Sequence, residues 1–437
     1  MSRKSVATPS RNPWPIRLFW CISILAASIY VAIFFAANRI APFVAATHGT
    51  GILDIRGEAW DSTSVRVQKT VKPNSKVFEF PISAIIDLNN TNHGPVGQLL
   101  NFDNGATLRH MLLLLRTKIP GQYHLLFWAT RILHERRRGP SSQWHGWFSM
   151  LPDIIPGCLT WPASFLPCLD SATRNGTYIL TETTVLAETM LNQMMNNQTI
   201  PVDLRSSVFV DLNRNVSLAE VTWAMMFFLK SNLQDQAILP IWNLARVSNE
   251  KAGLGFRFDR DSNQIILTAP QGAKQGEELV VNYLQGPGRY LMAHSKALSA
   301  PKGIDANVNV PTETSGAREY CILHYAALQF DIGGTPKAPL LNCVAVNLAS
   351  GPERKRLLKS PTSEKSGTLL QKTYEQLASA AREELKHIDE ILSDATCNTL
   401  EPQTTYSAIK QTSLLLQGTL RLAVRHCDFH AEKFRDN

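Results

Sequence analysis

Two hydrophobic periodicities run along the chain. Residues 64–67 and 77–81 alternate apolar and polar side chains, which is typical of half-buried strands, and the turn signal Pro73-Asn74-Ser75 lies between them. These segments predict a strand pair. Residues 370–391 and 405–434 instead repeat apolar side chains every three or four positions, which predicts two amphipathic helices. Because their connection is short, we expect the two helices to form an antiparallel pair.

The middle of the chain is mainly helical in pattern. Helices are predicted over residues 111–115, 123–133, 182–195 and 218–229. The breaker Pro120-Gly121 separates the first two of them. Ser217 precedes the last helix and Glu220 lies three residues further on, which is the spacing of a capping box.

Breaker-rich stretches mark the expected loops and boundaries. An Asn- and Gly-rich loop is predicted over residues 89–105, a linker over 299–318 and a basic boundary over 351–362. Residues 319–348 are expected to hold two strands. Strands and helices thus occupy largely separate parts of the chain, which predicts an α+β fold.

Residues 18–37 form an apolar run without a charged side chain. Its length matches the ~20 residues that a helix needs to cross ~30 Å of hydrocarbon. The basic residues before it are Arg3, Lys4, Arg11 and Arg17. The positive-inside bias therefore predicts a basic cytoplasmic tail over residues 1–17, a single transmembrane helix over 18–37 and a lumenal remainder in the endomembrane system. Two alternatives stay open, namely a signal peptide cleaved near Val44-Ala45-Ala46 and a leader for plastid import.

A chain in the lumen would be exposed to N-glycosylation and to an oxidising environment. Sequons of the form N-x-[ST] occur at Asn89, Asn175, Asn197 and Asn215, where translocation would make them glycan acceptors. Of the seven cysteines, Cys158 and Cys168 lie close enough in sequence to form a disulfide in an oxidising lumen. No C-x-x-C pair occurs, so we expect no zinc site of the usual spacing and assign no metal ligand.

Composition is that of a folded protein. With 44% hydrophobic and 18% charged residues, wholesale disorder is excluded. The formal net charge of +8 comes partly from basic clusters at residues 136–138 and 354–356. No aromatic residues interleave with these clusters, so we interpret them as solvated surface and expect no nucleic-acid partner.

The stretch over residues 238–283 carries the strongest functional signal. It contains Leu239-Pro240-Ile241-Trp242, then Gly276-Glu277, and ends six residues later at Tyr283. This order resembles the C-terminal half of a SET domain, the fold of protein lysine methyltransferases. Further pieces in register with that family are Leu133-x-Glu135, Ser142-x-Trp144, Leu151-Pro152, Trp161 and His294-Ser295. Together they resemble the split-SET class, which includes the plastid Rubisco large-subunit lysine methyltransferases and the actin-histidine methyltransferases.

The resemblance implies a domain organisation. It predicts a SET-like β-fold over residues 50–300, interrupted by a helical insert at about 105–215. A mainly helical C-terminal domain follows over residues 319–437, of the kind that docks substrates in this family. The implied partners are therefore a protein and, through residues 18–37, the lipid bilayer.

The resemblance also implies a chemistry. It predicts an S-adenosylmethionine-dependent protein (lysine) N-methyltransferase, which passes a methyl group to an amine or imidazole nitrogen. Tyr283 matches the catalytic tyrosine that lies beside the transferred methyl group. Positions that match the cofactor-binding residues are Ser64, Val65, Asn243, Arg246 and Val247, and an alternative placement uses Asn249.

Several of these positions depart from the family pattern. Arg246 and Val247 replace an Asn-His pair that holds the adenine. Asn243 replaces the preceding aspartate, Ser64 replaces a glycine of the first strand, and Leu284 replaces the glycine after the tyrosine. Hydrogen bonds left unmade to a buried polar ligand cost about 1–3 kcal/mol each, so these cofactor motifs are weakened.

Two other functions compete with catalysis of methyl transfer. A non-catalytic SET-like module would keep the fold and bind a partner protein. A type II membrane glycosyltransferase would suit the anchor and the sequons, and its Mn²⁺ ligands would come from the triplet Asp259-Arg260-Asp261. That triplet lies between strand-like runs at residues 255–256 and 265–267, which favours a hairpin turn instead.

Overall fold

The computed structural model describes most of the chain beyond residue 50. The described residues are 50–51, 53–56, 64–81, 86–87, 94–102, 106–118, 120–149, 151–233, 237–238, 245–248, 253–259, 261–281, 287–294, 305–308, 321, 329–400 and 402–435. The predicted tail 1–17 and transmembrane segment 18–37 lie outside these residues. Within the described ranges, no helix combines the length and the apolar character needed to cross a bilayer.

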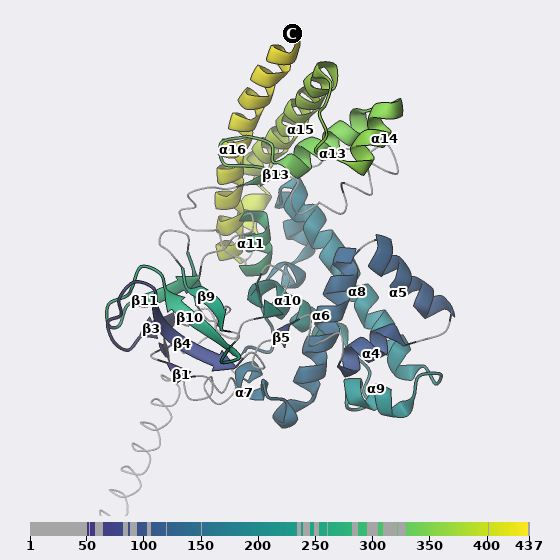
Figure 1. Ribbon diagram of the computed structural model, residues 1–437, viewed down its shortest axis with the longest axis vertical. Helices are drawn as coiled ribbons and strands as arrows, with labels where there is room; N and C mark the ends of the chain where they lie inside the picture. Colours follow the sequence, from purple (N-terminus) through teal and green to yellow (C-terminus); the bar gives the residue numbers. More distant parts are fainter. Residues whose placement is uncertain are drawn as a thin grey trace, which may run out of the picture.

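Two four-stranded sheets lie together on one side of the molecule and are called the β body below (Figure 1). One sheet has the order β1 (Thr50–Gly51), β4 (Ser75–Pro81), β10 (Gln264–Ala269) and β9 (Gly255–Asp259). The other has the order β2 (Leu53–Arg56), β3 (Ser64–Val67), β11 (Glu278–Val281) and β8 (Arg246–Val247). Neighbouring strands are antiparallel in both sheets, except that β11 and β8 run parallel.

The strands predicted over residues 64–67 and 77–81 are confirmed, but they do not pair with each other. β3 lies between β2 and β11, whereas β4 lies between β1 and β10. The connection between them explains the difference, because Val71 forms a bridge to Ala273 and leads the two strands into different sheets. The predicted strand pair is therefore wrong as a pairing.

Alternation along the strands buries one face of each. Val65 and Val67 of β3 are buried, and they share the core of the β body with Leu279 and Val281 of β11. Full burial of such a side chain stabilises the fold by about 1.5–3 kcal/mol. A slip of one residue would expose all four side chains, so this core fixes the register of β11 against β3.

A helical insert follows the first strands and leads back to the later ones (Figure 1). Its helices are α4 (Pro95–Asn101), α5 (Ala106–Lys118), α6 (Pro120–Arg137), α7 (His145–Phe148), α8 (Ser171–Asn196), α9 (Val202–Phe209) and α10 (Leu218–Ser231). A small sheet, ordered β5 (Ile86–Asp87), β7 (Ala237–Ile238) and β6 (Asn232–Leu233), lies where the chain enters and leaves the insert. In the centre of the insert, Trp128 stacks on Phe228 with ring centroids 5.4 Å apart. Trp147 meets Phe227 nearly edge-on at 5.1 Å, so these rings join α6, α7 and α10 into one core.

The helices predicted in this region are confirmed, but a predicted loop contains a helix and one helix begins earlier than predicted. Glu220 donates its backbone N–H to the Ser217 hydroxyl at 3.3 Å and its carboxylate accepts the Ser217 N–H at 3.0 Å, so the predicted capping box is present. The predicted loop 89–105 contains α4, which starts at Pro95, a residue suited to the first turn of a helix. The helix predicted from residue 182 begins earlier, at Ser171, because the Asp170 carboxylate caps it.

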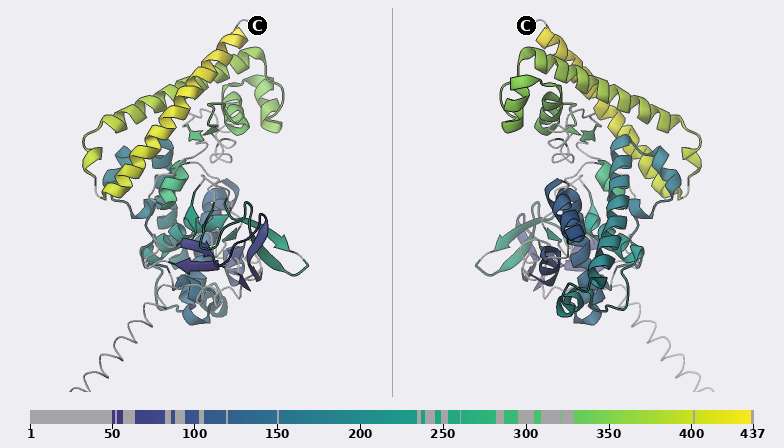
Figure 2. Two further views of the ribbon diagram at one scale, coloured as in Figure 1. Left: turned by 90° about the vertical axis from the view of Figure 1, so that its left-hand side faces the viewer. Right: turned by 90° about the vertical axis from the view of Figure 1, so that its right-hand side faces the viewer.

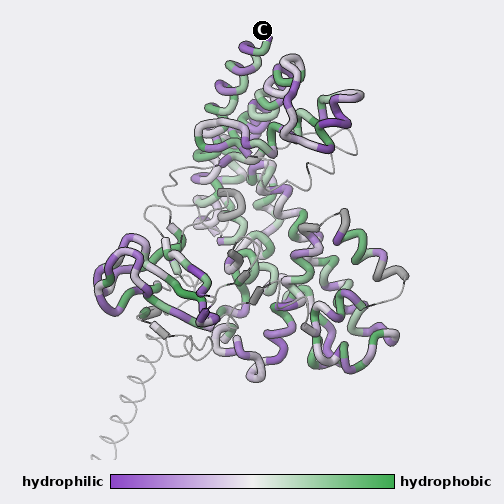
Figure 3. The backbone as a smooth tube through the Cα atoms, viewed as in Figure 1, coloured by the Kyte–Doolittle hydropathy of each residue, from purple (hydrophilic) through white to green (hydrophobic). Residues whose placement is uncertain are grey.

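The C-terminal part is mainly helical. Its elements are α11 (Pro287–His294), β12 (Ala306–Asn307), β13 (Gln329–Phe330), α13 (Ala338–Leu348), α14 (Gly351–Lys359), α15 (Gly367–Ser393) and α16 (Gln403–Arg435). α15 and α16 form the predicted antiparallel pair and reach furthest from the β body (Figure 2). Hydrophobic and hydrophilic positions alternate along both helices, as the period of their sequences requires (Figure 3).

Two predictions for the C-terminal part are wrong. Residues 319–348 do not hold two strands in the described part of that range, because α13 replaces the second. Its apolar run is short enough to resemble a buried strand, an ambiguity that periodicity alone leaves open. The boundary predicted over residues 351–362 contains α14, since Gly351 and Pro352 occupy the first turn rather than interrupting a helix.

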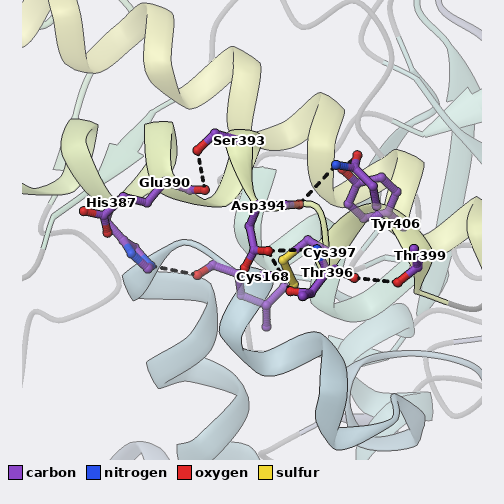
Figure 4. Close-up of a disulfide and its surroundings, with 11 residues drawn as sticks. Cys168, His387, Glu390, Ser393, Asp394, Thr396, Cys397, Thr399 and Tyr406 are labelled. Carbon is purple, nitrogen blue, oxygen red and sulfur yellow. Dashed lines mark hydrogen bonds between the residues drawn. A yellow bond between two sulfur atoms is a disulfide. The ribbon is translucent and has the colours of Figure 1, made fainter.

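Two disulfides form among the cysteines that the structure describes, and neither is the predicted one. Cys168 bonds to Cys397 across a sequence separation of 229, and Cys321 bonds to Cys343. Cys158 is a free, buried thiol, and burial raises its pKa to about 12, so it stays protonated at neutral pH. The Cys168–Cys397 bond fastens the insert to the turn between α15 and α16 (Figure 4).

Candidate functional site

The Gly276-Glu277 motif forms the tight turn that begins β11. Gly276 has a φ of 76°, a left-handed conformation that glycine adopts without steric cost. The Glu277 N–H donates to the carbonyl of Lys274 at 2.9 Å, and the Glu277 carboxylate accepts the Lys274 N–H at 2.9 Å. The Gly-Glu motif therefore stabilises the local turn, since glycine permits the left-handed backbone and glutamate closes the turn through its hydrogen bonds with Lys274.

β11 brings together the two ends of the candidate site. Leu279 of β11 is opposite Val65 of β3, and Val281 is opposite Val247 of β8. The Ser248 N–H extends this pairing by donating to the Val281 carbonyl at 3.0 Å. Residues that are far apart in sequence thus meet on three adjacent strands, as the predicted site requires.

The β3 candidates take different positions in this sheet. The Val65 side chain is fully buried in the core of the β body, and its backbone is paired within the sheet, opposite Ile55 of β2 and Leu279 of β11. The Ser64 hydroxyl is half-buried and accepts a hydrogen bond from Arg66 Nε at 3.3 Å. Arg66 also donates to the Gly276 carbonyl at 2.9 Å, so it ties β3 to the turn before β11.

The β8 candidates do not form a polar pocket. The Arg246 side chain is 51% exposed, and its Nε donates to the Glu278 carboxylate at 2.9 Å. Val247 is half-buried and packs against the core of the β body. The positions that match the adenine-holding pair thus carry a surface ion pair and an apolar side chain.

Three site residues predicted from the sequence lie outside the described residues. They are Tyr283, Asn243 and Asn249. In the sequence, Tyr283 follows the end of β11 by two residues. The Leu239-Pro240-Ile241-Trp242 segment also falls outside the described ranges.

The predicted insert motif forms a buried network. The Glu135 side chain is only 1% exposed, and its carboxylate accepts hydrogen bonds from the Ser142 hydroxyl at 2.8 Å and pairs with Arg131 at 2.8 Å. The same Ser142 oxygen accepts the Trp144 N–H at 3.2 Å. Burial lowers the pKa of the adjacent His134, although the Glu135 carboxylate opposes that shift. These residues hold α6 against the following loop, so the motif has a role in packing.

Comparisons with known proteins agree with this arrangement at the level of the fold. No protein-family model matches the chain, and no curated protein matches its sequence. A solved structure of the SET domain of LSMT bound to lysine and AdoHcy is 14% identical with a TM-score of 0.58, and the match covers 89% of each chain. The chain has a SET-like fold. The resemblance predicted from the sequence is therefore confirmed for the fold.

Two further solved structures support the same likeness. Rubisco LSMT bound to sinefungin and monomethyllysine is 13% identical with a TM-score of 0.56, covering 92% of this chain and 93% of that one. Rubisco LSMT bound to AdoMet is 12% identical with a TM-score of 0.55, covering 89% of each chain. The likeness spans the β body, the insert and the C-terminal helices, so it extends beyond the SET core.

The described candidate residues fit only part of a site for S-adenosylmethionine. An adenosine and a charged amino acid moiety need several polar partners. Val65 is buried and paired within the sheet, Val247 offers an apolar contact, and Arg246 is already paired with Glu278. Among the described candidates, the half-buried Ser64 hydroxyl is therefore the one side-chain group that could donate a hydrogen bond away from the surface.

A small hollow adjoins β11. Its lining consists of residues 253–254, 269–272 and 277–280, and its cavity volume is about 30 Å³. A cavity of this size can hold water, whereas a nucleoside needs far more room. This hollow is therefore not the cofactor site.

The Asp259-Arg260-Asp261 triplet forms a hairpin turn. β9 and β10 pair directly on either side of it, with Asp259 opposite Gln264. The Asp259 carboxylate accepts the N–H groups of Asp261 at 3.2 Å and Ser262 at 3.4 Å. Its oxygen is occupied within the turn, so the interpretation as a hairpin is confirmed.

Sequence analysis missed one feature of the site region and one disulfide elsewhere in the fold. In the site region, Glu278, the second glutamate of the Gly-Glu-Glu sequence, is the partner of Arg246. The Cys168–Cys397 bond had no sequence signal, because spacing says nothing about cysteines that meet across 229 residues.

Proposed function

We propose that this chain is an S-adenosylmethionine-dependent protein N-methyltransferase that acts on a lysine side chain. The observation that carries the proposal is the meeting of β3, β11 and β8 within a SET-like fold. Of the solved structures of like fold, one holds AdoHcy with lysine, one holds sinefungin with monomethyllysine, and one holds AdoMet. A protein substrate is the corresponding partner for this chain.

S-adenosylmethionine would supply an electrophilic methyl group on its sulfonium. A lysine nucleophile must reach it as the neutral amine, although its ordinary pKa is ~10.4. Removal of the amine from water favours the neutral form. In this proposal Tyr283, two residues beyond β11, orients the amine nitrogen, while the buried core of Val65 and Leu279 holds β11 rigid beneath it.

A non-catalytic SET-like module that binds a protein is the second candidate. The ion pair between Arg246 and Glu278 and the apolar Val247 favour it, because they stand where the resemblance expects hydrogen bonds to adenine. A module of this kind would retain the fold and the C-terminal helices and would have no affinity for the methyl donor.

Calorimetric titration of the full chain with S-adenosylmethionine separates the two candidates. A catalytic protein should bind with a micromolar Kd. The variant Arg246→Asn/Val247→His restores the residue types of the family, and each regained hydrogen bond of about 1.4 kcal/mol should tighten binding about tenfold. Arg257→Asn on β9 is a matched control that also removes an exposed arginine from the β body, and it should leave the affinity unchanged.

The outcomes of this titration are distinct. Binding by the native chain supports the enzyme. Binding by the restored variant alone supports a module that has lost its cofactor site. If both proteins are folded and neither binds S-adenosylmethionine, a cofactor site at β3 and β8 is contradicted. Binding of a sugar nucleotide with Mn²⁺ would instead support glycosyl transfer.

We also propose that residues 18–37 anchor the chain in an endomembrane and that the rest lies in the lumen as a glycoprotein. The two disulfides support this placement, because such bonds persist mainly in oxidising compartments. The anchor then contacts the lipid bilayer, and the methyl donor has to reach the lumen. Protease protection of the C-terminal part in sealed microsomes tests this placement, and digestion without detergent would contradict it.

A further inference from the structure

We propose that Asn197 and Asn215 carry N-linked oligosaccharides, while Asn175, which has the same sequon pattern, carries none. The inference rests on the lumenal placement proposed above and is independent of methyl transfer. Three sequons of the described chain thereby divide into two classes according to their surroundings.

Asn197 lies in the turn between α8 and α9. It is the C-cap residue of α8, and Gln198 and Thr199 after it are both exposed. The Asn197 side-chain oxygen accepts hydrogen bonds from the Thr199 N–H at 2.9 Å and from its hydroxyl at 2.8 Å. The acceptor amide and the hydroxyl of the sequon therefore already lie together in a loop that an enzyme can approach.

Asn215 lies in the exposed loop between α9 and α10. Its own side chain and that of Ser217 are exposed. The backbone of the loop is held from beneath, since Asn192 exchanges two hydrogen bonds of 2.8 Å with Val216, and Arg137 donates to the Asn215 carbonyl at 2.9 Å. These contacts engage the main chain and leave the Asn215 side chain on the surface, where an oligosaccharide displaces no packed group.

Asn175 is placed differently, within α8. Thr177, the hydroxyl residue of its sequon, is 3% exposed and donates to the Thr173 carbonyl at 2.9 Å. The residue between them, Gly176, lies so close to Met292 of α11 that an added Cβ would come within 3.1 Å of that side chain. The triplet therefore belongs to a helix–helix contact, and the extended conformation that a transferase requires would break α8.

The disulfides that support the lumenal placement also favour an environment in which such transfer occurs. Cys168, Cys397, Cys321 and Cys343 are all buried, so their bonds form as the chain folds rather than on an accessible surface afterwards. Folding in an oxidising lumen exposes the same chain to oligosaccharide transfer.

The covalent step is a glycosyl transfer from a lipid-linked pyrophosphate oligosaccharide. The Asn side-chain nitrogen forms a bond to the anomeric carbon of the first sugar, the bond from that carbon to the pyrophosphate oxygen breaks, and the amide loses one proton. The lipid pyrophosphate leaves with the electron pair of the broken bond. No oxidant or reductant takes part.

Both proposed glycans lie at one end of the insert. Asn192, which holds the Asn215 loop, precedes Asn197 on the last turns of α8. α9 lies between the two sequons and is on the opposite side of the insert from the β body (Figure 1). The oligosaccharides would therefore cover the α8–α9 end and leave β11 and β8 accessible to a protein partner.

Expression of the full chain in a eukaryotic cell tests the inference by gel mobility before and after removal of N-glycans. All variants carry Asn89→Gln, because that sequon lies outside the described residues. Asn197→Gln and Asn215→Gln should each remove one glycan step, the double variant should remove both, and Asn175→Gln should change nothing.

Asn215→Ser is the matched control for the exposed loop, because it moves the sequon to Asn213, which is also exposed. This variant should regain the glycan step that Asn215→Gln loses. A glycan mapped to Asn175, or steps that persist in the double variant, would overturn the inference. So would the lack of any step in every variant, and that result would leave the cofactor titration unaffected.

Discussion

At the scale of single residues, Gly276 offers a direct test of the turn that begins β11. Its φ is 76°, and an added Cβ would meet no atom within 4 Å. Alanine at this position therefore pays only for the left-handed backbone, and Gly276→Ala should lower the free energy of unfolding by about 1 kcal/mol. Chemical denaturation measures this change.

Gly418 is the matched control for that substitution. It lies within α16, is exposed, and also has no atom within 4 Å of an added Cβ. Because alanine is favoured over glycine in a helix, Gly418→Ala should raise the free energy of unfolding by up to about 1 kcal/mol. Equal effects of the two substitutions would contradict the conformation assigned to Gly276.

The ion pair of Arg246 and Glu278 offers another test at the level of single residues. The pair lies at the surface, where such interactions contribute about 0–1 kcal/mol. A double-mutant cycle with Arg246→Ala and Glu278→Ala should give a coupling energy within that range and lose it at high salt. A coupling energy of several kcal/mol would contradict the exposed position of the Arg246 guanidinium, because a surface ion pair does not reach that value.

At the scale of elements, the hydrogen bond between Ser142 and Glu135 joins the end of α6 to the loop that follows. Ser142→Ala would leave one carboxylate oxygen of a buried glutamate without its 2.8 Å partner. The expected loss is about 1–3 kcal/mol in the free energy of unfolding. The neighbouring Ser141 is exposed, so Ser141→Ala should change stability by less than about 0.5 kcal/mol.

The contact between α8 and α15 contains two buried carboxyl groups. Burial raises the pKa of Asp170, and burial together with the Asp170 charge raises the pKa of Glu384, while the positive charge of His387 lowers both. The folded protein therefore holds protons that the unfolded chain releases above pH ~4.3. This contribution to stability is present at acid pH and is lost as the pH rises toward the folded pKa values.

Glu384→Gln tests that contact. The amide oxygen can still accept the Ser171 N–H, which donates to Glu384 at 2.9 Å in the native protein. The variant should be more stable than the native protein by about 1 kcal/mol at pH 7 and should lose this advantage near pH 4. Thermal unfolding measures how the stability of each protein changes across this pH range. Parallel curves of stability against pH for the two proteins would count against the assigned pKa shifts.

Elements with a long, regular period were predictable from the sequence. α15 and α16 repeat apolar residues over many turns, and α10 combines an apolar run with the Ser217–Glu220 cap. The first half of α8 was missed because buried threonines, Thr173 and Thr177, rather than an apolar stripe, face its neighbours, and Thr177 donates to the carbonyl one turn earlier. Local pattern could not show that β3 and β4 pair with other strands rather than with each other, because Val71 and Ala273 meet only in the folded chain.

At the scale of the whole molecule, the Cys168–Cys397 bond joins parts of the chain that are far apart in sequence. His387 of α15 supports the same contact, since its Nε2 lies 3.1 Å from the Leu169 carbonyl (Figure 4). In the chain-entropy account, a bond that closes a loop of 229 residues stabilises the fold by about 5 kcal/mol. The same account gives about 3 kcal/mol for Cys321–Cys343, with its separation of 22.

Paired alanine variants compare the two bonds. Cys168→Ala/Cys397→Ala should lower the free energy of unfolding more than Cys321→Ala/Cys343→Ala does. Denaturation of both double variants under oxidising conditions provides the measurement. A larger loss for the Cys321 pair would mean that the long loop contributes little to the unfolded-state entropy.

The candidate site was only partly predictable. Motif order sufficed to predict that Ser64 and Val65 lie in one sheet with Arg246 and Val247, and the structure places them on the two strands that flank β11. The sequence did not indicate what their side chains do there. The burial of Val65 and the pairing of Arg246 with Glu278 depend on strand register and on neighbours distant in sequence.

The proposed activity is methyl transfer beside the end of β11. It is tested by measuring transfer of labelled methyl from S-adenosylmethionine to a lysine-containing protein with the native chain and with Tyr283→Phe. We expect measurable transfer by the native chain, a loss of about 100-fold in Tyr283→Phe and an unchanged affinity for the methyl donor. Equal transfer by both proteins, or no transfer by a native chain that binds the donor, would rule the proposed activity out.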